Sequence, residues 1–207
     1  YDACRKIAIL SSLMTGKHVD YKDIYTEGIT KITTTDFTYA KKAGWTIKLL
    51  AMSKEVDGKY FAMVTPCMIN ASNPLYNVND VFNGIFVKGD MLDDSMYYGR
   101  GAGKLPTASA VVADVIECAK TLGSNVPILW DAEELKIADN DDCERKFFVR
   151  AALSERGAVL NSFTNITEIR TDDMDFGFIT EVMTEKEFTS RIKGLREVLS
   201  VIRVDET

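Results

Sequence analysis

The spacing of apolar residues predicts helices in four parts of the chain. In residues 2–15, Ile7, Leu10 and Leu13 follow one another at helical intervals, and a glycine stands where the helix would end. Three other stretches have helical character; one of them is begun by a capping threonine (Thr34 or Thr35) and another by a proline, and both of these are closed by a glycine. These further helices are expected at residues 35–42, 107–122 and 185–195.

Stretches rich in β-branched and aromatic residues lie between these helices and predict strands. Asp57-Gly58 separates the first two stretches and is typical of a hairpin turn. We expect strands at 45–53, 60–66, 81–88, 94–98, 146–153, 176–182 and 198–204, with alternating aromatics (Phe147, Phe148, Phe176, Phe178) in the core. This order of elements indicates an α+β (α/β) fold, a mixed β-sheet covered by helices and followed by a small β-α-β domain.

A change in composition divides the chain. Residues 124–145 are mainly acidic and polar, and they end in Asp139-Asn140-Asp141-Asp142, which is typical of a linker. We therefore predict a first domain at 1–125, a linker at 126–145 and a second domain at 146–207. Since 46% of all residues are hydrophobic, both parts are expected to fold around a core.

The charge and the cysteines exclude several functions. A net charge of −6 argues against nucleic acid or an anionic membrane as a partner, and the apolar runs are far too short to span a bilayer. Four widely spaced cysteines favour neither a zinc site nor a disulfide framework, so we expect reduced thiols in a cytoplasmic protein and no metal site; they are Cys4, Cys67, Cys118 and Cys143.

A glycine-rich segment is the strongest candidate for a binding loop. Gly99, Gly101 and Gly103 fall within five residues and precede a proline that suits a first helical turn. Such a loop delivers helix amides to an anionic or polar ligand, although it can also be a plain structural turn. Tyr98 and Leu105 stand where a phosphate-binding Walker loop needs glycine and serine or threonine, and the glycine spacing also differs from the dinucleotide fingerprint.

Other polar residues allow a structural and a functional interpretation. Asp2 and Lys6 are four apart, so they share one helix face, and by spacing alone they form an ordinary surface ion pair. His18, the single histidine, is expected to be a surface loop residue, and Glu27 a structural carboxylate.

The segment from Gly99 to Asp114, GRGAGKLPTASAVVAD, resembles the signature segment of homoserine dehydrogenases nearly residue for residue. Asp2-Ala3-Cys4-Arg5-Lys6 is similar to the family's Asp-x-x-x-Lys catalytic helix, and residues 19–29 and 79–89 resemble further family blocks. The resemblance implies that Lys6 is the general acid/base and that Asp2 holds the substrate's ammonium group. It also implies that Gly99, Arg100, Gly101, Ala102 and Gly103 lie against the nicotinamide side of the cofactor.

The resemblance further implies an NAD- or NADP-dependent oxidoreductase that interconverts L-aspartate 4-semialdehyde and L-homoserine on the route to threonine, methionine and isoleucine. The resemblance also implies a preceding Rossmann domain that binds most of the cofactor, which we expect to lie outside this chain. We therefore expect a C-terminal part that is inactive alone and forms a homodimer through a mixed sheet at residues 45–98.

The last part of the chain resembles the ACT-type regulatory domain that many family members carry. Its first loop, at residues 154–160, lacks the usual proline, and little room remains for a helix and a strand before Phe176. We therefore expect a shortened first helix, which weakens the case for an amino-acid effector such as threonine. The alternative function is a non-catalytic, amino-acid-sensing dimeric module.

Overall fold

The computed structural model describes residues 1–125, 127–170 and 175–206 of the chain. These residues form two compact units. The first consists of residues 1–70 and 129–207, and the second of residues 71–128. Within the described residues, no helix has the length and the apolar composition that crossing a membrane requires.

A mixed β-sheet forms the centre of the first unit. Its described strands follow the order β1-β3-β10-β6-β8-β7. In addition, β2 pairs with β3, and β9 pairs with β6. β10 is parallel to β3 and antiparallel to β6, so it joins the two halves of the sheet. The strands are β1 (Tyr25–Thr26), β2 (Thr46–Val56), β3 (Lys59–Ile69), β6 (Glu144–Ala152), β7 (Thr167–Ile169), β8 (Asp175–Ile179), β9 (Met183–Thr184) and β10 (Val198–Asp205).

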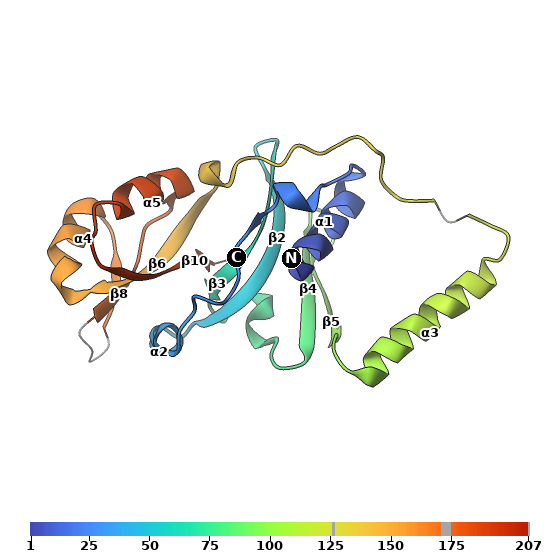
Figure 1. Ribbon diagram of the computed structural model, residues 1–207, viewed down its shortest axis with the longest axis horizontal. Coiled ribbons are helices and arrows are strands. Elements are labelled where there is room, and N and C mark those ends of the chain that lie inside the picture. The colour runs from blue at the N-terminus through green and yellow to red at the C-terminus, as the bar shows by residue number, and fades with distance from the viewer. Residues whose placement is uncertain (126, 171–174, 207) are drawn as a thin grey trace. The chain divides into compact units, whose positions relative to one another are not determined.

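Helices cover both faces of this sheet (Figure 1). α4 (Arg156–Ser162) and α5 (Glu185–Ile192) enclose an aromatic cluster that includes the alternating residues Phe147, Phe176 and Phe178. On the opposite face, α2 (Thr34–Lys42) packs over Phe148, and α1 (Asp2–Thr15) packs against β2 and β3. Gly177 permits this close approach of α2, because a Cβ there would lie 2.7 Å from the Tyr39 ring.

The tail from β6 to β10 forms a complete β-α-β-β-α-β unit with the strand order β10-β6-β8-β7. The prediction of a loop at residues 154–160 was wrong, because α4 begins at Arg156 inside that stretch. No proline interrupts it, and Val159 is fully buried on the inner face of the helix. The helix is short, as expected, and it leaves room for β7.

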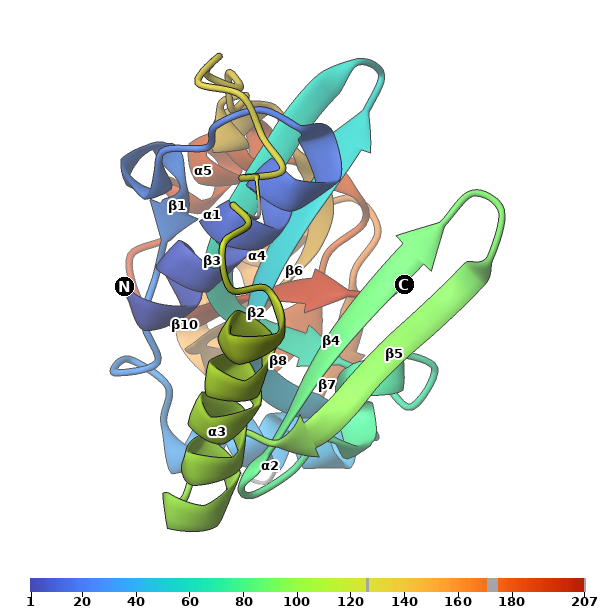
Figure 2. The ribbon, with the colours of Figure 1, turned by 90° about the vertical axis from the view of Figure 1, so that its right-hand side faces the viewer.

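The second unit consists of a hairpin and a helix (Figure 2). β4 (Phe82–Gly89) pairs only with β5 (Asp93–Arg100) among the described strands, and α3 (Lys104–Lys120) follows. The expected mixed sheet at residues 45–98 is therefore wrong, because β2 and β3 belong to the sheet of the first unit. The hairpin packs instead on the 3₁₀ turn Pro74–Asn77, where Leu75 and Val78 lie so close to Gly84 that a Cβ would collide with them.

Several other boundaries differ from the predictions. α2 is capped by Thr33 rather than by Thr34 or Thr35, since Thr33 and Asp36 form a reciprocal capping box. α3 begins at Lys104, three residues before the predicted start, so Pro106 lies in its first turn as proline tolerates.

The predicted linker is bonded to the first unit along much of its length. Backbone hydrogen bonds join His18 to Glu133 and Leu135, at 2.8 and 2.7 Å, and Ala138 donates to the carbonyl of Tyr60 at 2.8 Å. Leu135 also packs beside the apolar cluster under α1. The division at 1–125, 126–145 and 146–207 therefore does not coincide with the compact units, because the tail completes the sheet that β2 and β3 begin.

Candidate functional site

Asp2 and Lys6 lie together in the first two turns of α1. The Lys6 ammonium is 2.8 Å from Oδ2 of Asp2, and the side chains are 69% and 83% exposed for Lys6 and Asp2 respectively. The hydrogen bond from Lys6, reinforced by its charge, lowers the pKa of Asp2 below its ordinary value. Asp2 is therefore ionised near neutral pH, and the pair faces outward, available to a ligand.

The opposite face of α1 is fixed to the first unit by buried polar contacts. Ser11 Oγ lies 2.7 Å from Ser53 Oγ on β2, and Ser53 donates in turn to the hydroxyl of Tyr60 on β3. Ser12 Oγ accepts from the amide of Val19 at 3.0 Å. These contacts determine the direction in which α1 presents Lys6.

The glycine-rich segment forms the junction between β5 and α3 in the second unit. Gly103 is the N-cap of α3 and has a φ of 117°, a value that glycine adopts without strain. Gly99, Gly101 and Ala102 are also exposed. The first amides of a helix have no intrahelical acceptor, so the amides of Lys104 and Leu105 are donors beside the glycines, whereas Pro106 has no N–H.

Arg100 is separated from the glycines by the pleat of the hairpin. Its guanidinium lies 5.1 Å from the centre of the Phe82 ring, which is itself stacked on Tyr98 at 4.8 Å. Successive residues of a strand point to opposite faces. Arg100 therefore lies on the aromatic face of the hairpin, and Gly99 and Gly101 lie on the other face.

The structure assembles the candidate residues in two groups. Asp2 and Lys6 form an ion pair in the first unit, and Gly99, Arg100, Gly101, Ala102 and Gly103 form a loop in the second. His18 is exposed, as predicted. The described residues contain no cluster of His, Cys, Asp or Glu that could hold a metal ion.

The cysteines are unpaired thiols. Burial raises the pKa of Cys67 to about 12, so this thiol stays protonated and unreactive near neutral pH.

Two buried charge clusters escaped the sequence prediction. Arg203 on β10 binds Glu185 on α5, Glu27 beside β1 at 2.6 Å and Thr65 on β3 at 2.9 Å. Burial alone would lower the pKa of Arg203, but the hydrogen bond and charge of Glu185 hold it above its ordinary value. Glu27 is thus a structural carboxylate, yet no local signal links it to a strand so distant in sequence.

The second cluster fastens α2 to the tail. Arg150 on β6 contacts Asp36 on α2 at 3.0 Å and Asp175 on β8 at 2.6 Å. Tyr39 also donates to Asp175 at 2.7 Å. Both clusters join residues that are distant in the sequence and meet only in the folded chain.

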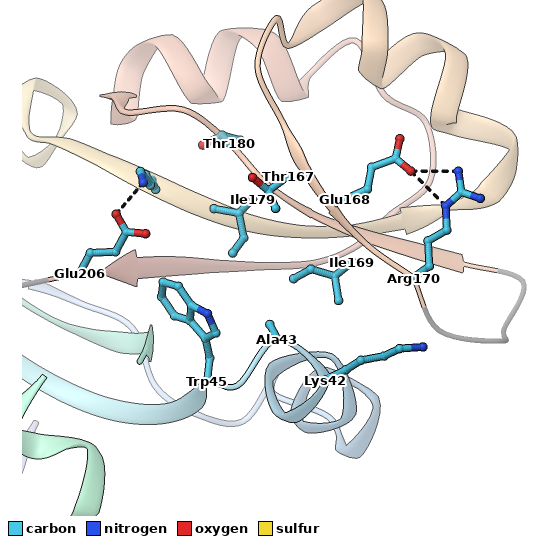
Figure 3. Close-up of a pocket in the computed structure, with 11 residues that line it drawn as sticks. Lys42, Ala43, Trp45, Thr167, Glu168, Ile169, Arg170, Ile179, Thr180 and Glu206 are labelled. Atoms are coloured by element: carbon cyan, nitrogen blue, oxygen red, sulfur yellow. Dashed lines mark hydrogen bonds and ion pairs between the residues drawn. The ribbon is translucent and has the colours of Figure 1, made fainter. Parts of the chain in front are cut away.

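A pocket of about 480 Å³ lies in the first unit, between the end of α2 and the edge strand β7 (Figure 3). Trp45, Ala43 and Ile169 give it apolar walls. Two ion pairs, Lys146–Glu206 at 2.5 Å and Glu168–Arg170 at 3.1 Å, lie at its ends. The pocket suits a small molecule that combines an apolar part with charged groups.

Comparisons with known proteins agree on one family. The sequence profile of the homoserine dehydrogenase family matches residues 1–116. The homoserine dehydrogenase of Mycobacterium tuberculosis is 32% identical, and the match covers 100% of this chain and 54% of the relative. A crystal structure of a homoserine dehydrogenase from Thiobacillus denitrificans superposes with a TM-score of 0.83 at 28% identity, covering 99% of this chain and 53% of that one.

The homoserine dehydrogenase of S. aureus, in its crystal structure at pH 7.5, superposes with a TM-score of 0.76 at 27% identity over 100% of this chain. The chain thus spans about half the length of the relatives that it matches. The mixed sheet flanked by helices agrees with the predicted fold class.

Proposed function

Because the chain belongs to the homoserine dehydrogenase family, we propose that it supplies the substrate-binding and proton-transfer part of an enzyme of its relatives' length. The reaction is the NAD- or NADP-dependent interconversion of L-homoserine and L-aspartate 4-semialdehyde, in the cytoplasmic synthesis of threonine, methionine and isoleucine. The observation that carries this proposal is the outward-facing Asp2–Lys6 pair on a helix held from behind.

Lys6 has the chemistry that reduction of an aldehyde requires. When the carbonyl carbon gains a hydride, negative charge develops on oxygen, and a proton must arrive there to complete the alcohol. The Lys6 ammonium donates that proton, and in the reverse direction the neutral amine removes it from the hydroxyl. A nicotinamide cofactor, when bound, supplies or accepts the hydride.

Asp2 orients Lys6 and offers its second oxygen to the substrate. Both substrates carry an α-ammonium group, and a carboxylate pairs with such a group through charge-assisted hydrogen bonds. The lowered pKa keeps Asp2 ionised for this role over the physiological range. The same carboxylate thereby connects proton transfer to substrate binding.

The loop from Gly99 to Gly103 suits a cofactor because backbone can approach it closely. The left-handed φ of Gly103 and the open space beside Gly99, where an added Cβ would meet nothing within 4 Å, leave the glycine side uncovered. The first amides of α3 favour a nearby anionic or polar group. We assign Gly99, Arg100, Gly101, Ala102 and Gly103 to the cofactor's side of the site, with Arg100 acting from the aromatic face.

The test is an enzyme of the relatives' length assayed with homoserine and either NAD or NADP. We expect turnover by the whole enzyme and none by the 207-residue chain. Lys6→Arg keeps the charge but donates a proton poorly, so it separates proton transfer from simple charge stabilisation. Absence of turnover by the whole enzyme with both cofactors would favour the non-catalytic alternative.

We further propose a homodimer in which the free edge of β2 pairs with a second copy. Within the described chain, β2 pairs only with β3, and its Leu49 is 45% exposed. A long unpaired edge is a ready site for strand pairing. Sedimentation at tens of micromolar, roughly the range of weak dimers, should show a dimer, and Leu49→Lys should weaken it; an unchanged dimer would move the interface elsewhere.

Finally, we propose the pocket beside Trp45 as the place to test for an amino-acid effector such as threonine. The complete β-α-β-β-α-β tail, which resembles an ACT domain, favours this second role. Binding should change the fluorescence of Trp45, and Trp45→Phe should abolish the signal while Trp130 remains. A flat titration would leave the tail without an effector at this pocket.

A further inference from the structure

Asn83, within the segment 79–89, lies directly against the loop assigned to the cofactor. It is on β4, where it pairs with Gly99. Residues two apart on a strand share a face, so Gly101 lies diagonally beside Asn83. A Cβ added to Gly101 would overlap Nδ2 of Asn83 and lie 2.8 Å from its Cγ. The carboxamide therefore fills the space that a side chain at position 101 would need.

The two faces of the hairpin differ sharply around this contact. Phe82, Tyr98 and Arg100 stack on one face. On the other face, Gly99 has no neighbour within 4 Å of an added Cβ, and the three atoms nearest to an added Cβ at Gly101 all belong to Asn83. Asn83 is thus the side chain that borders the bare backbone.

We propose that Asn83 is a positioning residue for the cofactor loop. Its carboxamide packs against Gly101 and thereby sets how closely the Gly99–Gly103 backbone approaches a bound dinucleotide. The amide of Gly101 also donates to the carbonyl of Val81, in a hydrogen bond that is long at 3.3 Å. This inference rests on the proposed function, because the ligand is the cofactor of that reaction.

Gly101→Ala and Asn83→Ala together test the contact as a double-mutant cycle in an enzyme of the relatives' length. Gly101→Ala must displace the carboxamide, and Asn83→Ala removes the support. We expect each to raise the KM for the dinucleotide by about tenfold while kcat at saturation changes little, because the coupling of touching residues has this size. The double variant should lose clearly less than the product of the two effects, since the overlap disappears with the carboxamide. Lys88→Ala, exposed on the same strand, is the control and should match the wild type.

Hydrogen exchange in the 207-residue chain provides a measurement that does not depend on catalysis. Asn83→Ala should speed exchange of the amides from Gly101 to Lys104 several-fold, with the melting temperature unchanged, and Lys88→Ala should not. If the whole enzyme proves inactive but exchange responds, the proposed function fails and the positioning role stands. Unchanged exchange together with multiplicative KM effects would overturn the role of Asn83.

Discussion

The two compact units of this chain differ in how each of them is stabilised internally. The first unit buries Tyr39, Phe147, Phe148 and Phe178 on both faces of its sheet, and it fastens its helices with enclosed ion pairs. In the second unit, α3 has no buried residue in its seventeen-residue length, and its apolar side chains are half exposed; they include Val111, Val112, Val115 and Ile116. A helix that is apolar on several sides is normally covered. The first unit therefore has a buried core of its own, whereas α3 has the apolar surface of a helix that is normally covered by a partner.

Lys6→Ala should give the largest effect and separates catalytic from structural importance in the first unit. In an enzyme of the relatives' length, kcat should fall on the order of 10²–10⁴-fold, the size of general acid–base catalysis. The melting temperature should not change, because Lys6 is exposed and its ion pair with Asp2 lies on the surface. Turnover within about threefold of the wild type would reject proton donation, since that effect lies far below the expected range.

Phe148→Ala tests how tightly the core of the first unit is packed. Its ring is fully buried between β6 and α2, so the cavity should lower the free energy of unfolding of the 207-residue chain by about 3–5 kcal/mol. Urea unfolding followed by circular dichroism measures this loss. A loss below about 1 kcal/mol would mean that the core is loosely packed.

Asp175→Asn tests how charge holds α2 to the tail. Burial alone would raise the pKa of Asp175, but hydrogen bonds from Tyr39 and Arg150 hold it below its usual value. A depressed folded pKa adds stability above the unfolded pKa, near 3.9, and this stability is lost as pH falls through the folded pKa. The variant should be about 1–2 kcal/mol less stable at pH 7 and should lose less stability than the wild type between pH 5 and pH 2. Parallel acid-unfolding curves would contradict this account.

Val115→Ala is expected to have the smallest effect and tests whether α3 is covered in the longer enzyme. Because Val115 is 61% exposed, the change should alter the stability of this chain by less than about 0.5 kcal/mol. In an enzyme of the relatives' length, a cost of 1 kcal/mol or more, as for a buried methyl group, would show that α3 is covered there. Equal small effects in both proteins would leave α3 as a solvated helix.

The elements with strong local signals could be predicted from the sequence. The helix from Asp2 to Thr15 has the predicted bounds, and the Asp57-Gly58 turn joins β2 to β3 as expected. A shortened helix was expected in the tail, but its start at Arg156 was not predicted because seven residues are too few to show a periodic pattern. The prediction of a mixed sheet at residues 45–98 was wrong, because local composition does not show which strands pair with one another.

The candidate site was predictable only in part. The resemblance indicated Lys6 and the glycines, but spacing alone favoured a surface ion pair, and the geometry agrees with both interpretations. Asn83 required the register of the hairpin, which places it opposite Gly99. The Arg203 and Arg150 clusters join residues from distant parts of the chain, so no window of sequence contains them.

The position of β10 also affects how the chain is made. Arg203 pairs with Cys67 on β3. The C-terminal half of β3 therefore lacks its β10 neighbour until the whole segment between these two strands has been synthesised. Until β10 emerges from the ribosome, that half of β3 exposes unpaired backbone and apolar side chains, which are the features that promote aggregation of nascent chains. Folding of the first unit is therefore expected to be completed only after β10 has been synthesised.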